Sequence, residues 1–164
     1  MLPTIQNILY ATDLSENARY AYTYAASLAQ RYGARITILH VIEKRSAETS
    51  LQSDNHPGEE KWKKNQGAKR SDFISQIRGR LSRFCDEISS EVDACTFQVD
   101  KIIVSEGIAA DEILHQAGRN DVDLIVIGTR GLGVFGAALM GGTARRVVRS
   151  STIPVLVIRR PENS

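Results

Sequence analysis

Short apolar runs that alternate with helical stretches constrain the fold of this chain more than any other feature of its sequence. The runs are rich in β-branched residues, which is typical of strands. Strands that follow one another across helical connections pair in parallel, because parallel neighbours need a crossover connection. The sequence therefore predicts an α/β fold, an open parallel five-stranded sheet with helices on both faces. The predicted strands are Asn7–Thr12, 35–42, 97–104, 123–127 and Val155–Ile158.

The stretches between these runs carry apolar residues at helical spacing. Between residues 18 and 32 alanine, leucine and tyrosine recur every three or four positions, and Gly33 supplies a stop. A second apolar stripe covers residues 73–88. Acids open a third helix at residues 111–117, as the helix dipole prefers, and a fourth helix covers residues 143–149. The third strand is the most polar, which predicts a place at the sheet edge.

A polar segment interrupts the pattern between residues 43 and 70. It is rich in charged residues and contains Pro57, Gly58 and Gly67, which predicts an exposed excursion. A chain of 164 residues with 42% hydrophobic residues can bury one sizeable core. We therefore expect a single domain over residues 1–164.

Charge and terminal sequence set expectations for location and partners. The formal net charge of +2 does not indicate a nucleic-acid or membrane surface. The first residues lack the features of a signal peptide, and no apolar run approaches the roughly 20 residues that cross a bilayer. Cys85 and Cys95 form no disulfide framework or metal spacing. We expect a cytoplasmic protein. From Leu124 onward, however, the sequence contains six arginines and only one acid, Glu162, so this part of the chain favours the binding of an anion.

A glycine-rich loop follows the fourth predicted strand. Gly131, Gly133 and Gly136 match the G-x-G-x-x-G fingerprint of dinucleotide-binding proteins. That fingerprint requires the first strand-to-helix turn and an acid about 20 residues later, and this chain offers neither. A P-loop requires a lysine, and the last lysine is Lys101. The context therefore excludes both loops.

A different glycine spacing fits a phosphate site. Gly128, Gly131, Gly141 and Gly142 place bare backbone at a strand end, in the loop and at the start of the last helix. Such backbone can approach phosphate oxygens closely, and free N–H groups at a helix start favour negative charge. Ligands of open α/β sheets bind beyond the carboxyl ends of the strands. We therefore expect the site at the loops that follow the first, second and fourth strands.

On these residues the chain resembles the ATP-binding branch of the universal stress protein (UspA-like) family. The segments that carry the resemblance are NILYATDLSENA, ITILHVIE, VDLIVIGTRG and IPVLVIRR, so it covers nearly the whole chain except the 43–70 excursion. The family motif is G-x2-G-x9-G followed by Ser or Thr. Gly128, Gly131 and Gly141 match it, whereas Gly142 stands where the hydroxyl residue belongs and Thr143 comes one residue late.

The resemblance implies the strand order 3-2-1-4-5, a site for ATP with Mg²⁺, and a homodimer. The residues implied to surround the adenosine are Ala11, Thr12, Asp13 and Val41. Those implied to line the ribose and phosphates are Gly128, Thr129, Arg130 and Gly131, with Gly141, Gly142 and Thr143 at the helix start. The homodimer is expected to form through Val155, Leu156, Val157 and Ile158.

The sequence leaves three functions open. The first is a stress-response module that binds ATP without strong catalysis, and the second is an interaction protein whose nucleotide site is vestigial. The third is a slow ATPase that uses Asp13 and a metal. No nucleophile with a base, paired carboxylates or metal cluster can be read from the chain, so no catalytic or metal-binding residue is predicted. Asp13 itself is either a cap of the first helix or a nucleotide ligand, and His40 is expected to be an interior histidine.

Overall fold

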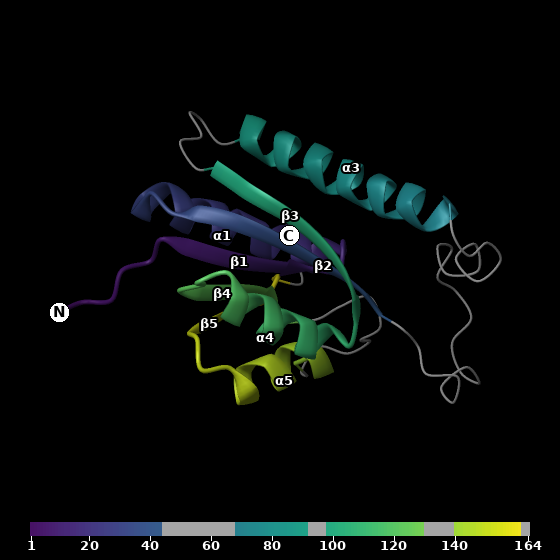
Figure 1. Cartoon of the computed structure of the whole chain (residues 1–164). Coiled ribbons are helices and arrows are strands. Elements are labelled where there is room, and N and C mark those ends of the chain that lie inside the picture. Colours follow the sequence, from purple (N-terminus) through teal and green to yellow (C-terminus); the bar gives the residue numbers. More distant parts are fainter. Residues whose placement is uncertain (44–67, 92–97, 130–139, 162–164) are drawn as a thin grey trace.

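Five parallel strands form one sheet in the order β3-β2-β1-β4-β5. The structure is a computed structural model and describes residues 1–43, 68–91, 98–129 and 140–161. β1 (Asn7–Thr12) lies at the centre, between β2 (Arg35–Glu43) and β4 (Leu124–Gly128). The predicted fold class and the strand order implied by the resemblance are both confirmed (Figure 1).

The two edges of the sheet are formed by β3 (Gln98–Gly107) and β5 (Val155–Ile158). The polar character of the third run therefore predicted its edge position correctly. A register shift between Ile36 and Thr37 marks the pairing of β2 with β3. Such irregularities are common near sheet edges, where they increase the local twist.

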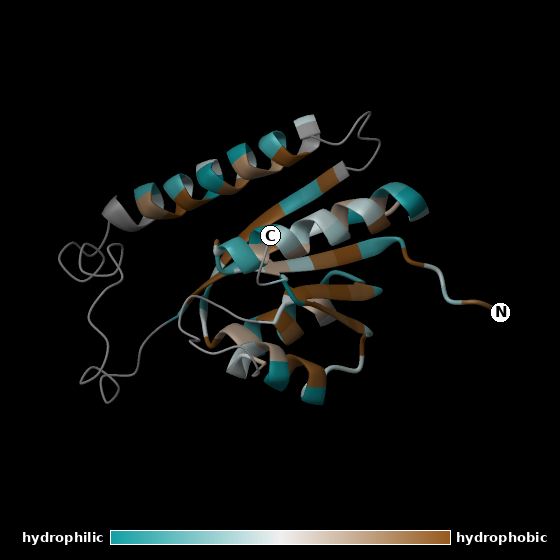
Figure 2. Cartoon of the chain, turned by 180° about the vertical axis from the view of Figure 1, so that it is seen from behind, coloured by the Kyte–Doolittle hydropathy of each residue, from teal (hydrophilic) through white to brown (hydrophobic). Residues whose placement is uncertain are grey.

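In the described part of the chain, two helices cover each face of the sheet. α1 (Glu16–Tyr32) and α3 (Ala68–Glu91) pack on one face, and α4 (Ala109–Arg119) and α5 (Gly142–Ser150) pack on the other. Each strand alternates its side chains between the two layers, so that neighbouring residues enter different cores. Figure 2 shows the alternation of teal and brown along α3 that a helix with one buried face requires.

α1 begins and ends where its sequence predicts, and it lies close to the sheet. The Ser15 side chain accepts a hydrogen bond from the Ala18 N–H, and Gly33 closes the helix in the left-handed conformation with φ 63°. Ala21, Ala25 and Ala29 are fully buried against the strands. Because alanine is small, the helix axis can approach the sheet closely.

The predicted 43–70 excursion needs a correction at each end. β2 extends to Glu43, so the first residue of that segment lies in a strand. α3 begins at Ala68, so the last residues of that segment are helical. The sequence from 68 to 70 is AKR, and all three residue types favour helices. Residues 44–67 lie outside the described part of the chain.

None of the described helices combines the length and the apolar character that a membrane span requires.

Candidate functional site

The crossovers diverge at the carboxyl ends of β1 and β4. β1 pairs with β4 through Ala11 and Ile127, but the chain leaves β1 for α1 on one face and β4 for α5 on the other. On its other side β1 pairs with β2, with Thr12 opposite His40. Ligands of open α/β sheets bind at such a divergence. The predicted residues Ala11, Thr12 and Val41 therefore lie together at the carboxyl ends of β1 and β2.

The turn from β1 into α1 is held by its own side chains. The Thr12 hydroxyl accepts a hydrogen bond from the Leu14 N–H at 3.0 Å, and the Asp13 carboxylate accepts one from the Ser15 N–H at 3.0 Å. Leu14 adopts a left-handed backbone with φ 66°, which is unusual for a residue with a Cβ atom. Ser15, not Asp13, caps the helix. The interpretation of Asp13 as the helix cap is therefore wrong, because its carboxylate closes the preceding turn.

His40 joins β2 to this turn. Its Nδ1 lies 2.9 Å from the Thr12 carbonyl oxygen, and since a carbonyl can only accept, Nδ1 carries the proton. Burial lowers the pKa of His40, although the Thr12 carbonyl and the Asp13 charge act in the opposite direction. His40 is a partly buried histidine with a satisfied donor, as the sequence predicted.

A backbone hydrogen bond connects the residue after β4 to the residue before α5. The Thr129 N–H donates to the Ile158 carbonyl at 2.8 Å, and the Gly141 N–H donates to the Thr129 carbonyl at 2.7 Å. Gly128 packs beside the start of α1, where a Cβ atom would lie 3.4 Å from the Asn17 backbone oxygen. The predicted site residues Arg130 and Gly131 lie outside the described residues, as do Gly133 and Gly136.

The first turn of α5 presents bare backbone. Gly141 occupies the position before the helix and supplies no side-chain cap, and Gly142 is the first helical residue. A Cβ atom on Gly142 would meet nothing within 4 Å. Thr143 follows inside the first turn, which contains no acid. Among the described residues no side chain caps this end, so its N–H groups are available to solvent or to a bound anion.

Ser105 is a candidate site residue that sequence reasoning missed. It pairs in register with Val41, and it follows Ile103 by two positions, so both side chains point toward the α4 and α5 layer. Its hydroxyl oxygen is buried and has no hydrogen-bond partner among the described residues. A serine two positions after Ile103, on the face of β3 that packs on α4, is the signal that could have identified it.

The site gathers donors and acceptors rather than a reactive pair. Of the predicted residues that the structure describes, Ala11, Thr12, Gly128 and Gly141 are buried, and Gly142 is exposed. Asp13, Val41, Thr129 and Thr143 are partly buried. The described residues contain no group of three or more His, Cys, Asp or Glu that could hold a metal ion. This chemistry suits the binding of a ligand with a polar end and an anionic end.

The chain is similar to known proteins over almost its whole length. A model described as the universal stress protein family matches residues 4–159. A protein of Thermus aquaticus named universal stress protein in QAH/OAS sulfhydrylase 3'region is 30% identical over 155 residues, which cover 94% of this chain and 98% of that protein.

Two further proteins have related sequences or structures. Universal stress protein MJ0577 of Methanocaldococcus jannaschii is 27% identical over 94% of this chain and 95% of its own length. The solved structure of MJ0577 covers 98% of this chain and 100% of its own, with a TM-score of 0.75 and 24% identity. The match to the structure of the universal stress protein from Archaeoglobus fulgidus in complex with dAMP covers 96% of this chain and 99% of that protein. Its TM-score is 0.59 and its sequence identity is 20%.

Proposed function

The chain belongs to the universal stress protein family, and from this premise we propose that it is a cytoplasmic module that binds ATP with Mg²⁺. The observation that carries the proposal is the open start of α5, where Gly141 is hydrogen-bonded to Thr129 at the end of β4. This arrangement puts unpaired backbone N–H groups beside the strand ends at which an adenosine would sit. The proposed role is binding that changes the partners of the protein, without strong catalysis.

The adenosine end of the proposed site comes from β1 and β2. Ala11 and Val41 supply apolar surface, and Asp13 supplies a carboxylate that accepts hydrogen bonds from a sugar or a base. The relative from Archaeoglobus fulgidus is described in complex with dAMP, which supports an adenine nucleotide as the ligand class.

The phosphate end comes from β4 and α5. Gly128 and Thr129 end the strand, and Gly141, Gly142 and Thr143 begin the helix. Arg130 and Gly131 are assigned to this end from the sequence alone. A serine at position 142 would add a hydroxyl to the backbone N–H, so its replacement by glycine costs about 0.5 to 1.5 kcal/mol of binding free energy. Such a loss weakens a nucleotide site without abolishing it.

The test is a calorimetric titration of the purified protein with ATP and with AMP, preceded by acid extraction and ion-exchange analysis of any bound nucleotide. We expect ATP to bind, and to bind more tightly than AMP because only ATP reaches the whole start of α5. If neither the wild type nor Gly142→Ser binds ATP, the protein is an interaction module with a vestigial site. Release of ADP at a steady rate would instead identify a slow ATPase.

The apolar edge strand β5 supports a homodimer. Val155, Leu156 and Val157 are partly exposed on a strand whose outer edge has no neighbouring strand in the sheet. An unprotected apolar edge invites pairing, and two copies of one strand pair across a two-fold axis. The proposed interface is formed by residues 155–158.

We expect light scattering to show a dimer at micromolar concentration and Val157→Lys to convert it to a monomer, because a charge would be buried in the interface. The matched control is Val148→Lys on the exposed side of α5, which should leave the dimer intact. A monomeric wild type, or a dimer that survives Val157→Lys, contradicts the proposal.

A further inference from the structure

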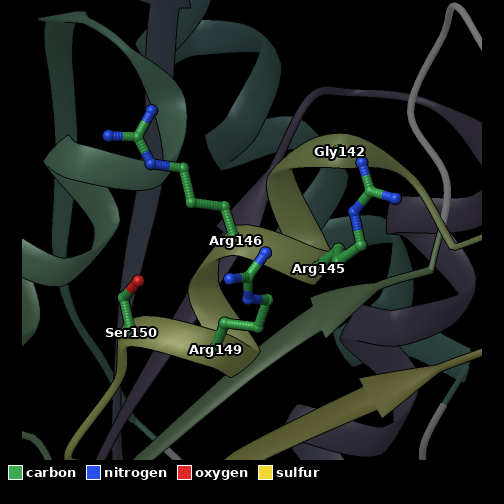
Figure 3. A pocket seen from close by; sticks show the side chains of 5 residues that line it. All are labelled: Gly142, Arg145, Arg146, Arg149 and Ser150. Atoms are coloured by element: carbon green, nitrogen blue, oxygen red, sulfur yellow. The ribbon is translucent and has the colours of Figure 1, made fainter.

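A hollow lined by arginines lies on the outer side of α5. Its volume is about 450 Å³, and its lining residues are Gly142, Arg145, Arg146, Arg149 and Ser150. We call it the α5 groove. Figure 3 shows Arg145 and Arg146 projecting in different directions from one turn of the helix and Arg149 projecting from the next turn. Among the described residues, the lining contains no acid, no aromatic ring and no apolar side chain.

Within the described part of the chain, two of the three arginines have no acidic partner. Arg146 forms an ion pair of 2.7 Å with Asp111 on α4. Arg145 and Arg149 form no ion pair or side-chain hydrogen bond with any of the residues that the structure describes. The groove therefore carries an excess of positive charge.

The position of Arg145 opposes the helix dipole. α5 has no acid in its first turn, and Arg145 lies about one turn from the helix start, where a cation is unfavourable. α1 and α4 begin with acids, at Glu16 and at Asp111 and Glu112, whereas α3, like α5, has no acid in its first turn. Arg149 lies in the last turn of α5, where the dipole favours a cation, so only Arg145 is placed against the dipole. A bound anion would offset this cost and the repulsion between the arginines.

A second hollow, between α1 and α3, provides a contrast. It has a volume of about 420 Å³ and includes Arg19, Arg80 and Arg83 in its lining. Glu16 and Glu87 line the same hollow, and Glu87 pairs with Arg19 at 3.2 Å. That hollow largely balances its own charges, so an excess of arginine is not a general property of this surface.

We propose that the α5 groove binds a linear chain of linked phosphate groups, with Arg145 and Arg149 as its ligands. The guanidinium fork donates two parallel hydrogen bonds to phosphate oxygens. Arg145 and Arg149 are four residues apart, about 6 Å along the helix axis. A ligand of several linked phosphates can accept from both guanidinium groups through different phosphates, and it carries more charge than a single phosphate, so it should bind the groove more tightly.

The lining also argues against the other polyanions. Single-stranded nucleic acid needs aromatic side chains on which bases stack, and a bound peptide needs apolar anchors. The groove offers neither. The proposed site does not depend on nucleotide binding, and Gly142 is the only residue that it shares with the proposed ATP site.

The test is calorimetric titration of the full chain with inorganic tripolyphosphate at low ionic strength. The groove variant is the double substitution Arg145→Gln and Arg149→Gln. The control variant, Arg31→Gln and Arg119→Gln, removes the same charge from exposed positions in the last turns of α1 and α4. We expect the groove variant to lose about tenfold or more in tripolyphosphate affinity while the control keeps wild-type affinity. Unchanged thermal unfolding of both variants establishes that they are folded.

Four outcomes would overturn the proposal. The first is a wild type that does not bind tripolyphosphate, and the second is an equal loss in the control variant. The third is hexaglutamate binding as tightly as tripolyphosphate, which would make the groove a surface for acidic peptides. ATP is titrated into the same variants: an equal loss of ATP affinity in the groove variant assigns the groove to the nucleotide site and also overturns the proposal. A wild type that binds tripolyphosphate but not ATP contradicts only the proposed nucleotide function.

Discussion

α1 and α5 both begin beyond the carboxyl ends of the strands, but their first turns differ in their capping and charge. α1 has a side-chain cap from Ser15, an acid at Glu16 and a preceding turn closed by Asp13. α5 has a glycine before it, no side-chain cap and no acid in its first turn. The first helix start is satisfied by its own residues, and the second leaves its N–H groups to solvent or a ligand.

The difference indicates which element serves stability and which serves binding. A capped start lowers the free energy of the folded chain whether or not a ligand is present. An open start gains most when an anion arrives. Substitutions at α1 should therefore change stability, and substitutions at α5 should change affinity. The four predictions below test that division, from the largest expected effect to the smallest.

Asp13 tests the boundary between the two roles, because it closes the turn and also belongs to the proposed site. Asp13→Ala should weaken ATP binding by about 1 to 3 kcal/mol through the loss of a charge-assisted hydrogen bond. Calorimetric titration of the folded variant measures this change. Asp13→Asn keeps an oxygen for the Ser15 N–H and serves as the control for the turn. If Asp13→Ala leaves ATP affinity unchanged, Asp13 is a turn residue only.

Ser15→Ala should affect stability alone. Removal of the cap should lower the free energy of unfolding by about 1 kcal/mol, with ATP affinity unchanged. Urea denaturation gives the first quantity and calorimetry the second. A loss of ATP affinity in this variant would break the comparison, since it would give the α1 start a direct part in binding.

Gly142→Ser should show the opposite signature at the start of α5. The added hydroxyl has open space around it and should tighten ATP binding by about 0.5 to 1.5 kcal/mol. AMP should gain less, because it lacks the distal phosphates. Thr143→Val is the control: α5 begins at Gly142, so Thr143 is turned by about 100° from that position and should contribute little. An equal gain for ATP and AMP would contradict a phosphate contact at position 142.

His40 should give the smallest effect, a dependence of stability on pH. Its folded-state pKa is lowered from the ordinary 6.5 by burial, so the unfolded chain binds the proton more readily. The contribution of His40 to the free energy of unfolding is fully present above the pKa that His40 has in the unfolded chain. It is lost as pH falls through the pKa that His40 has in the folded chain. Urea unfolding between neutral pH and about pH 5 should show this slope in the wild type and a shallower one in His40→Asn. An unchanged slope in His40→Asn would contradict this prediction.

Much of the fold could be predicted from the sequence because its signals are local. Alternating apolar runs predicted the strands, Gly33 predicted the end of α1, and acids at Asp111 and Glu112 predicted α4. The strand order was not predictable in this way, because the same alternation of strands and helices fits several orders. It came from the resemblance to a family.

The candidate site was less predictable because its details depend on tertiary contacts. Nothing in the sequence indicated the left-handed backbone of Leu14 or the hydrogen bond from Asp13 to the Ser15 N–H. The buried hydroxyl of Ser105 depends on how α4 covers β3. The charge excess of the α5 groove was visible as a count of arginines, but only the fold shows that Arg146 has a partner on α4.

The row of buried alanines on α1 limits how this chain can diverge. Ala21, Ala25 and Ala29 leave no room for a larger side chain, and an added methylene in a filled core costs about 1 to 3 kcal/mol. A larger residue would push α1 away from the sheet and with it the Asn17 backbone that packs on Gly128. Exposed faces can drift freely between relatives, whereas these three positions should remain small in every chain that keeps the same spacing between α1 and the sheet.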